Sequence, residues 1–311
     1  MKTQFQKIPF LVFLLFLFSD PSPRIYAAVP VYSEIITDCD SDKPGNNPVP
    51  GNHPPLSKNP TPGNLSTPGD HPVTGNNPAP SHDPAPINKL VPAFPLEARA
   101  LRDGWDLESL DTARNSEYLT VTEKDVILAL NMARTDPHRY AQLYISEIIS
   151  TYRGKLRSCS NGRIVKTIEG DVPAVELYNE LMRQDPRPRL IPVYWMHHIA
   201  DYLASEQSIT GNIGHITNDG NNLQFRIDSY GYWKKAIGET IDYGGMTGFD
   251  AINNLLIDDG ISNRSHRHVI FVPLFHVVGV SIRHHPVYGA VTVVDYADSF
   301  KVKPKASLVK N

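Results

Sequence analysis

The sequence has few cysteines: Cys39 and Cys159 are the only two among 311 residues. They allow at most one disulfide within the molecule, so the fold cannot depend on a disulfide framework. No C-x-x-C spacing occurs, so nothing indicates a cysteine-based metal site. A Cys39–Cys159 bond would tie the N-terminal part to the folded part. Two unpaired thiols or an intermolecular bond are the alternatives.

An excess of positive charge is also absent, because the net charge is −3 at pH 7. Nucleic-acid binding requires clustered basic side chains that neutralise phosphates. We therefore expect no nucleic-acid partner. The H-E-x-x-H and G-x-S-x-G motifs of zinc proteases and serine hydrolases are missing as well. The sequence thus assigns no catalytic residue, and an enzyme is the less favoured interpretation.

Long apolar runs are confined to the N-terminus, where residues 8–18 are nearly all apolar. A membrane-spanning helix needs about 20 apolar residues, so this run is too short for an ordinary span. A basic start before the run and Ala27 and Ala28 after it are typical of a secretory signal peptide, here over residues 1–28. We expect a secreted, extracellular protein with no membrane span in the mature chain. An uncleaved anchor is the alternative.

Proline is plentiful but unevenly placed, since most of the 27 prolines precede residue 97. Residues 43–88 repeat a loose Pro-Gly-Asn unit. Proline fixes φ and removes backbone donors, so no helix or strand ladder is expected there. The segment also lacks the apolar side chains that would offset its ordering entropy. We expect a disordered, partly extended spacer over 29–96, followed by a linker over 97–118.

The rest of the chain predicts one folded domain over 119–300, followed by a C-terminal tail over 301–311. Apolar residues recur at helical spacing first, and runs rich in Val and Ile come last. The predicted helices begin near Thr122 and Pro137 and cover 174–182, 194–209 and 249–257, and the predicted strands cover 277–282 and 290–296. Residues 151–170 are polar and are expected to be loop. This order favours the α+β class over a βαβ array.

Ionisable side chains are concentrated in four short stretches. These are Gly214–Gly220, Gly238–Ile241, Leu255–Gly260 and His266–Pro273. We expect each of them at the edge of a regular element or in a loop, where proteins position functional groups. Ala-Leu-Asn-Met-Ala-Arg-Thr-Asp-Pro at 129–137 precedes them, and Phe-His-Val-Val-Gly-Val at 275–280 and Val-Asp-Tyr-Ala at 294–297 follow.

In this order, the stretches resemble the CAP superfamily of cysteine-rich secretory proteins, antigen 5 and plant pathogenesis-related proteins, in its bacterial, cysteine-poor, SCP-like form. The resemblance covers residues 119–300 and leaves the N-terminal part out. It implies a three-layer α-β-α sandwich with a small, mainly antiparallel sheet. It also implies a cleft lined by two histidines, His215 and His266, and two acids. Glu239 is the first acid, and Asp258 is the second.

Two departures from the better-known members bear on this cleft. Thr240 stands where Asn usually follows the first acid, and the second acid is an Asp, one carbon shorter. Asp259, the next residue, is a rival for the second position. The shorter side chain affects the geometry of any metal site.

Two imidazoles and two carboxylates form a plausible first shell for a zinc ion, whose charge the carboxylates balance. The sequence therefore predicts His215, Glu239, Asp258 and His266 as ligand-binding and metal-binding residues. Without a metal, each acid favours the protonated form of a neighbouring imidazole. A polar network that only ties helix ends to the sheet is the structural alternative.

Other candidate residues have simpler interpretations. His268 and His276 are expected on the surface or in the sheet, His284 and His285 are expected to be solvated at a turn, and Trp195 and Trp233 are expected to be core or rim aromatics. For the two tryptophans, a sugar-stacking platform is the alternative.

Three functions compete on these grounds. The first is a module that binds a small molecule, a lipid or an extracellular protein partner through the cleft. The second is a metal-dependent extracellular hydrolase. The third is a surface-display or adhesive protein in which the spacer matters most.

Overall fold

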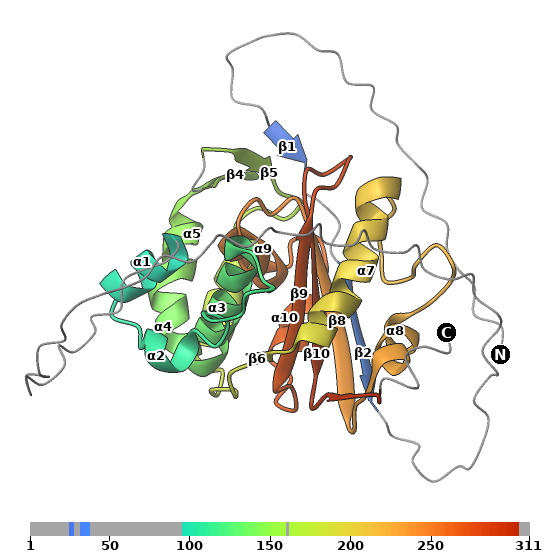
Figure 1. The fold of residues 1–311 in the computed structure, drawn as a ribbon. Coiled ribbons are helices and arrows are strands. Elements are labelled where there is room, and N and C mark those ends of the chain that lie inside the picture. Colours follow the sequence, from blue (N-terminus) through green and yellow to red (C-terminus); the bar gives the residue numbers. More distant parts are fainter. Residues whose placement is uncertain (1–24, 28–31, 38–94, 160–161, 305–311) are drawn as a thin grey trace, which may run out of the picture.

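The computed structural model describes residues 25–27, 32–37, 95–159 and 162–304 (Figure 1). The helices are α1 (Pro95–Arg102), α2 (Leu107–Leu110), α3 (Val121–Thr135), α4 (Pro137–Tyr140), η1 (Ala141–Ile145), α5 (Ser146–Ser150), α6 (Val172–Leu181), α7 (Tyr194–Thr210), α8 (Leu223–Tyr230), α9 (Gly248–Ile257) and α10 (Ser265–Ile270). The strands are β1 (Ile25–Ala27), β2 (Tyr32–Thr37), β3 (Tyr152–Arg153), β4 (Leu156–Ser158), β5 (Ile164–Lys166), β6 (Ile191–Pro192), β7 (Gly231–Tyr232), β8 (Ala236–Tyr243), β9 (Val277–Arg283), β10 (Val291–Ala297) and β11 (Lys301–Val302).

A five-stranded sheet in the order β2-β8-β10-β9-β6 organises the described domain. All neighbouring strands are antiparallel except β6 and β9, which run parallel. The register places Asp295 of β10 opposite Glu239 of β8 and opposite Gly279 of β9. The predicted α+β class agrees with this mixture of helices and a small, mainly antiparallel sheet.

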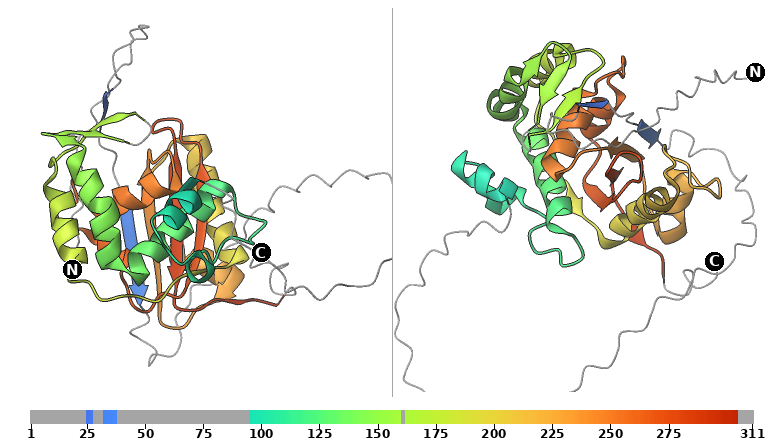
Figure 2. Two further views of the ribbon diagram at one scale, coloured as in Figure 1. Left: turned by 90° about the vertical axis from the view of Figure 1, so that its left-hand side faces the viewer. Right: turned by 90° about the horizontal axis from the view of Figure 1, so that it is seen from above.

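Helices cover both faces of the sheet (Figure 2). Ile237 and Ile241 of β8 pack in apolar clusters with residues of α7 and α8, whereas Ala236 packs with residues of α3 and α9. Successive strand residues point to opposite faces, so odd-numbered residues of β8 face α7 and α8, and even-numbered ones face α3 and α9. Gly279 shows how closely α7 lies, because an added Cβ would come within 2.1 Å of the Met196 carbonyl carbon.

Some element boundaries differ from the predictions for local reasons. Helix α3 begins after Thr120, not at Thr122, because Thr120 and Glu123 form a reciprocal capping box. The polar stretch over 151–170, predicted as loop, contains β3, β4 and β5. Gly211 caps α7 in the left-handed conformation, with φ of 73°, so the helix ends at Thr210, one residue beyond the predicted range 194–209.

The stretch over 97–118, predicted as a linker, contributes to the folded domain. It contains α2 and most of α1, and Ala100, Trp105 and Leu110 lie in the main apolar cluster. These apolar residues are too widely spaced to form a helical stripe long enough to predict α1 or α2 from periodicity.

The N-terminal predictions fall mostly outside the described residues. This holds for most of the signal peptide over 1–28, for Cys39 and its pairing with Cys159, and for the spacer except residues 32–37 and 95–96. Within the described part of the chain, no helix combines the length and the apolar character that a membrane crossing requires.

Candidate functional site

Glu239 lies in the middle of β8 with its side chain fully buried on the face covered by α7 and α8. The sequence predicted the edge of a regular element or a loop here. Strand β8 was missed because both of its faces are buried and the polar residues Thr240 and Asp242 interrupt the apolar pattern. A carboxylate in such a place needs charged or polar partners. Arg226, from α8, forms an ion pair with its Oε2 atom, and His215 contacts Oε1.

Charge keeps Glu239 ionised. Burial by itself raises the pKa of a carboxyl group, but the guanidinium of Arg226 and the contact with His215 outweigh it, so the pKa of Glu239 lies below its ordinary value. An ionised carboxylate only accepts hydrogen bonds. Nδ1 of His215 therefore donates to Oε1 of Glu239, over 2.6 Å.

The loop between α7 and α8 holds His215 in place through its backbone. Gln207 donates to the carbonyl of Gly214 over 2.7 Å, and the Tyr243 hydroxyl accepts from the Gly214 N–H over 2.8 Å. Arg226 also donates to the carbonyl oxygen of His215 over 2.8 Å. The arginine therefore binds both the histidine backbone and the acid, which fixes the distance between them.

Asp258 and His266 form a second pair, where α9 ends and α10 begins. Asp258 caps α9 in the left-handed conformation, with φ of 61°. Its Oδ1 accepts from Nδ1 of His266 over 2.6 Å, and its Oδ2 accepts from the His266 backbone N–H over 2.9 Å. Both side chains are buried, and Nε2 of His266 has no hydrogen-bond partner among the described residues.

Asp259, the rival for the second acid, has another role. Its two oxygens accept from the backbone N–H groups of Ile168 and Glu169 over 2.6 and 2.8 Å. It therefore ties the segment before α6 to the end of α9. The geometry favours Asp258 as the partner of His266.

The four predicted site residues are joined as two pairs in two helical layers. Glu239 has an odd number in β8, so its side chain points toward α7 and α8. Asp258 and His266 belong to the ends of α9 and α10, in the helical layer that covers the opposite face of the sheet (Figure 2). Among the described residues, no hydrogen bond or ion pair connects the His215 pair to the Asp258 pair. A single cleft that all four residues line remains a prediction.

The donor set does not fit the predicted four-ligand zinc site. Both oxygens of Glu239 and both oxygens of Asp258 already contact histidine or arginine groups. In this arrangement the carboxylates orient the imidazoles, as the outer partners of metal-bound histidines do. The described part of the chain contains no group of three or more His, Cys, Asp or Glu side chains arranged to hold a metal ion. Zinc binding remains a prediction.

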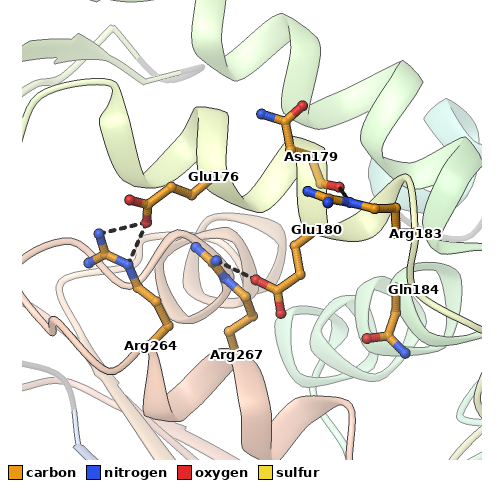
Figure 3. A pocket seen from close by; sticks show the side chains of 7 residues that line it. All are labelled: Glu176, Asn179, Glu180, Arg183, Gln184, Arg264 and Arg267. Carbon is orange, nitrogen blue, oxygen red and sulfur yellow. Dashed lines mark hydrogen bonds and ion pairs between the residues drawn. The ribbon is translucent and has the colours of Figure 1, made fainter.

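A polar hollow of about 560 Å³ lies between α6 and the start of α10 (Figure 3). Its lining comes from α6, the residues after it, and α10. Arg264 binds Glu169 and Glu176, and Arg267 binds Glu180, so these two cations are paired, whereas Arg183 donates to the carbonyl oxygen of Asn179. None of the four predicted site residues lines this hollow.

Sequence reasoning missed two residues of this region and misplaced a third. Arg226 was not predicted, although an arginine on the helix that follows the His215 loop could have been considered. Asp295 lies opposite Glu239 and helps to lower its pKa through a side-chain hydrogen bond. His285, predicted to be solvated, is fully buried, and its ring contacts the backbone of Asn212 over 3.1 Å. This corrects the expectation for His285.

Comparisons with family models, with curated proteins and with solved structures found no match for the chain.

Proposed function

We propose that this protein is a secreted binding module with a CAP-like α-β-α domain, and that it holds a small amphipathic ligand, such as a lipid, at the His215–Glu239–Arg226 cluster. Two features support the CAP-like assignment: the order of the motifs over residues 129–297, and helices on both faces of a small antiparallel sheet. The observation that carries the proposed function is that this cluster joins a buried ion pair to a histidine that reaches the surface.

Exposure distinguishes His215 from the other three predicted residues. Its side chain is 14% exposed, whereas the side chains of Glu239 and Asp258 are fully buried and that of His266 is 1% exposed. A ligand in solution can therefore contact the exposed edge of the His215 ring without opening the fold, although Nε2 of the ring is buried and Nδ1 contacts Glu239. Glu239 and Arg226 lie behind it and hold the ring at a fixed angle, which reduces the entropy lost on binding.

Apolar side chains beside this histidine suit an amphipathic ligand. Ile213 and Ile216, on either side of His215 in the loop, are 39% and 54% exposed. Phe225, next to Arg226 on α8, is 39% exposed. Exposed apolar groups around a polar centre are typical of binding surfaces. The ligand's apolar part would cover these side chains and the exposed edge of the imidazole ring.

The test is a binding assay on the full chain with a fluorescent long-chain fatty acid and with phosphatidylcholine vesicles. His215→Ala should weaken fatty-acid binding roughly ten-fold or more, because it removes the ring at the centre of the site. Ile216→Ser should weaken binding by a smaller factor. His276→Ala is the matched control, because His276 is an exposed histidine whose ring contacts only the carbonyl of Leu274.

Three results would contradict the proposal. One is equal binding by the parent and His215→Ala. Another is equal loss in His215→Ala and His276→Ala. The third is that the protein binds the vesicles but not the free fatty acid, and that Ile216→Ser binds the vesicles as well as the parent does.

A further inference from the structure

An aromatic strip lies outside the proposed ligand site. It consists of Tyr118, Tyr194, Trp195 and Tyr230, and each ring contacts the next. Tyr118 and Tyr194 have ring centroids 5.2 Å apart, Tyr194 and Trp195 are 5.4 Å apart, and Trp195 stacks on Tyr230 at 5.5 Å. We define these four residues as the aromatic strip.

The strip faces solvent on a rigid base. Tyr194 is 50% exposed and the other three rings are half-buried. Tyr194 and Trp195 occupy the first turn of α7, which packs firmly on β9 and β10. The Trp195 indole N–H and the Tyr194 hydroxyl donate to no described residue. The strip therefore presents flat apolar faces together with hydrogen-bond donors, which an ordinary core-facing aromatic cluster does not.

Proline-rich peptides bind surfaces of this kind. A polyproline II segment exposes its carbonyl oxygens, has little conformational entropy to lose, and docks on aromatic side chains whose polar ends donate to those carbonyls. The chain itself contains such a sequence: residues 43–88 repeat Pro-Gly-Asn units, with Pro-Val-Pro at 48–50 and Pro-Thr-Pro at 60–62.

The described segments that flank the spacer, β2 and α1, lie on opposite sides of the base of α7, where Tyr194 and Trp195 are found. Thr37, the last residue of β2, pairs with Ala236, and Trp233, three residues earlier, packs in the same cluster as Tyr230. The chain returns at α1, which packs on α2 and α3, and Tyr118 lies in the connection between α2 and α3. Figure 1 shows α8 and the end of β2 on one side of the base of α7, and α1 and α2 on the other.

We propose that the proline-rich spacer, residues 43–88, docks in the same molecule on the aromatic strip. Covalent attachment at both ends supplies a high effective concentration, so weak contacts are enough to keep the segment bound. The occupant is this chain's own segment, because the sequence has the required chemistry and its attachment points flank the strip. The proposal is independent of the ligand site at His215.

Tryptic cleavage of the full chain at Lys58 tests the proposal. Lys58 lies inside the spacer and is followed by Asn, whereas Lys43 is followed by Pro and is a poor site. Cleavage of a docked segment follows the population of the undocked state. We expect the double variant Tyr194→Ala/Trp195→Ala to be cut at Lys58 roughly five-fold faster than the parent, since the docked population falls. The readout is the initial rate by mass spectrometry.

Two controls separate docking from loss of fold. Val287→Ser removes an apolar side chain that is 67% exposed at the β9–β10 connection, away from the strip, and should leave the rate unchanged. Tyr194→Ala alone removes the most exposed ring and should raise the rate by a smaller factor, with the melting temperature close to that of the parent.

Other outcomes would overturn the proposal. Equal cleavage rates in the parent and in both strip variants would show that the spacer does not dock there. Protection that grows with protein concentration would assign the docked segment to a second copy of the chain. Binding of the parent to an insoluble glycan, lost in Tyr194→Ala while cleavage at Lys58 stays unchanged, would make the strip a sugar-binding surface.

Discussion

Two buried acids on opposite faces of β8 have pKa values shifted in opposite directions. Glu239 faces α8, and the guanidinium of Arg226 lowers its pKa. Asp242, three residues along the strand, faces α9, where it accepts hydrogen bonds from Asn254 and from the backbone of Gly245. Burial without a bound cation raises the pKa of Asp242 to about 7, although both hydrogen bonds lower it. One strand therefore carries an acid with a lowered pKa on one face and an acid with a raised pKa on the other.

The same contrast separates the two histidine pairs. Each has an Nδ1–carboxylate distance of 2.6 Å. The His215 pair has an arginine behind it and reaches the surface, whereas Asp258 uses its second oxygen to bind the backbone at the start of α10. The same histidine–carboxylate contact thus orients a ring that reaches the surface in one layer and joins two helices in the other.

Removing the guanidinium of Arg226 should lower the stability of the fold more than any other change considered. Arg226→Met leaves the fully buried Glu239 without its ion pair. Removing one partner of such a pair costs about 3–5 kcal/mol of unfolding free energy. Chemical denaturation at pH 7 measures this. Arg226→Met/Glu239→Leu removes both charges and should recover most of the loss; a double variant as unstable as the single one would contradict the ion-pair account.

The two acids of β8 should give opposite pH dependences. Glu239 has a lowered pKa, so its stabilisation is present above the unfolded pKa and is lost as the pH falls through the folded pKa. Asp242 has a raised pKa, so it binds its proton more tightly in the folded state. The stabilisation that this proton gives the fold is therefore lost as the pH rises from about 4 to 7.

Asp242→Asn should therefore remove a decline on the order of 2 kcal/mol between pH 5 and pH 8. Comparison of denaturation curves at both pH values checks this. Asp242→Asn is preferred to Asp242→Leu, because a leucine would abolish both hydrogen bonds as well as the titration. A pH dependence identical to that of the parent would show that Asp242 is ionised in the folded protein at pH 5.

A small change at the beginning of α9 should affect protein stability but not ligand binding. Thr247 caps α9 by accepting from the Asp250 N–H over 3.0 Å. Thr247→Ser keeps the cap, and Thr247→Ala removes it at a cost of about 1 kcal/mol. The Ala variant should bind the fatty acid as the parent does. Weaker binding would show that the two helical layers are coupled.

Part of this arrangement follows from the sequence alone. Helical spacing predicts α7 and α9, and Val- and Ile-rich runs predict β9 and β10, because each of these segments has a clear period. Strand β8 has none, since Glu239 and Asp242 occupy buried positions that are usually apolar. Motif order supplied Glu239 as a candidate, but it could not show that the residue lies in a strand.

The contacts of the site depend on distant pairings that periodicity does not encode. Arg226 carries no motif, and its importance appears only when α8 packs against β8. Asp258 and His266 are eight residues apart, and they meet where the chain turns through left-handed conformations at Asp258 and Arg264. The sequence therefore identified the chemistry but not its division between two layers.

The most direct test of this division compares His215→Gln with His266→Gln in the full chain, by thermal unfolding and by fatty-acid binding on the same samples. The account predicts that His215→Gln loses binding while its melting temperature changes little. It predicts that His266→Gln melts at a clearly lower temperature but, while folded, binds as the parent does. The opposite pattern, with binding lost at His266 and stability lost at His215, would contradict the account.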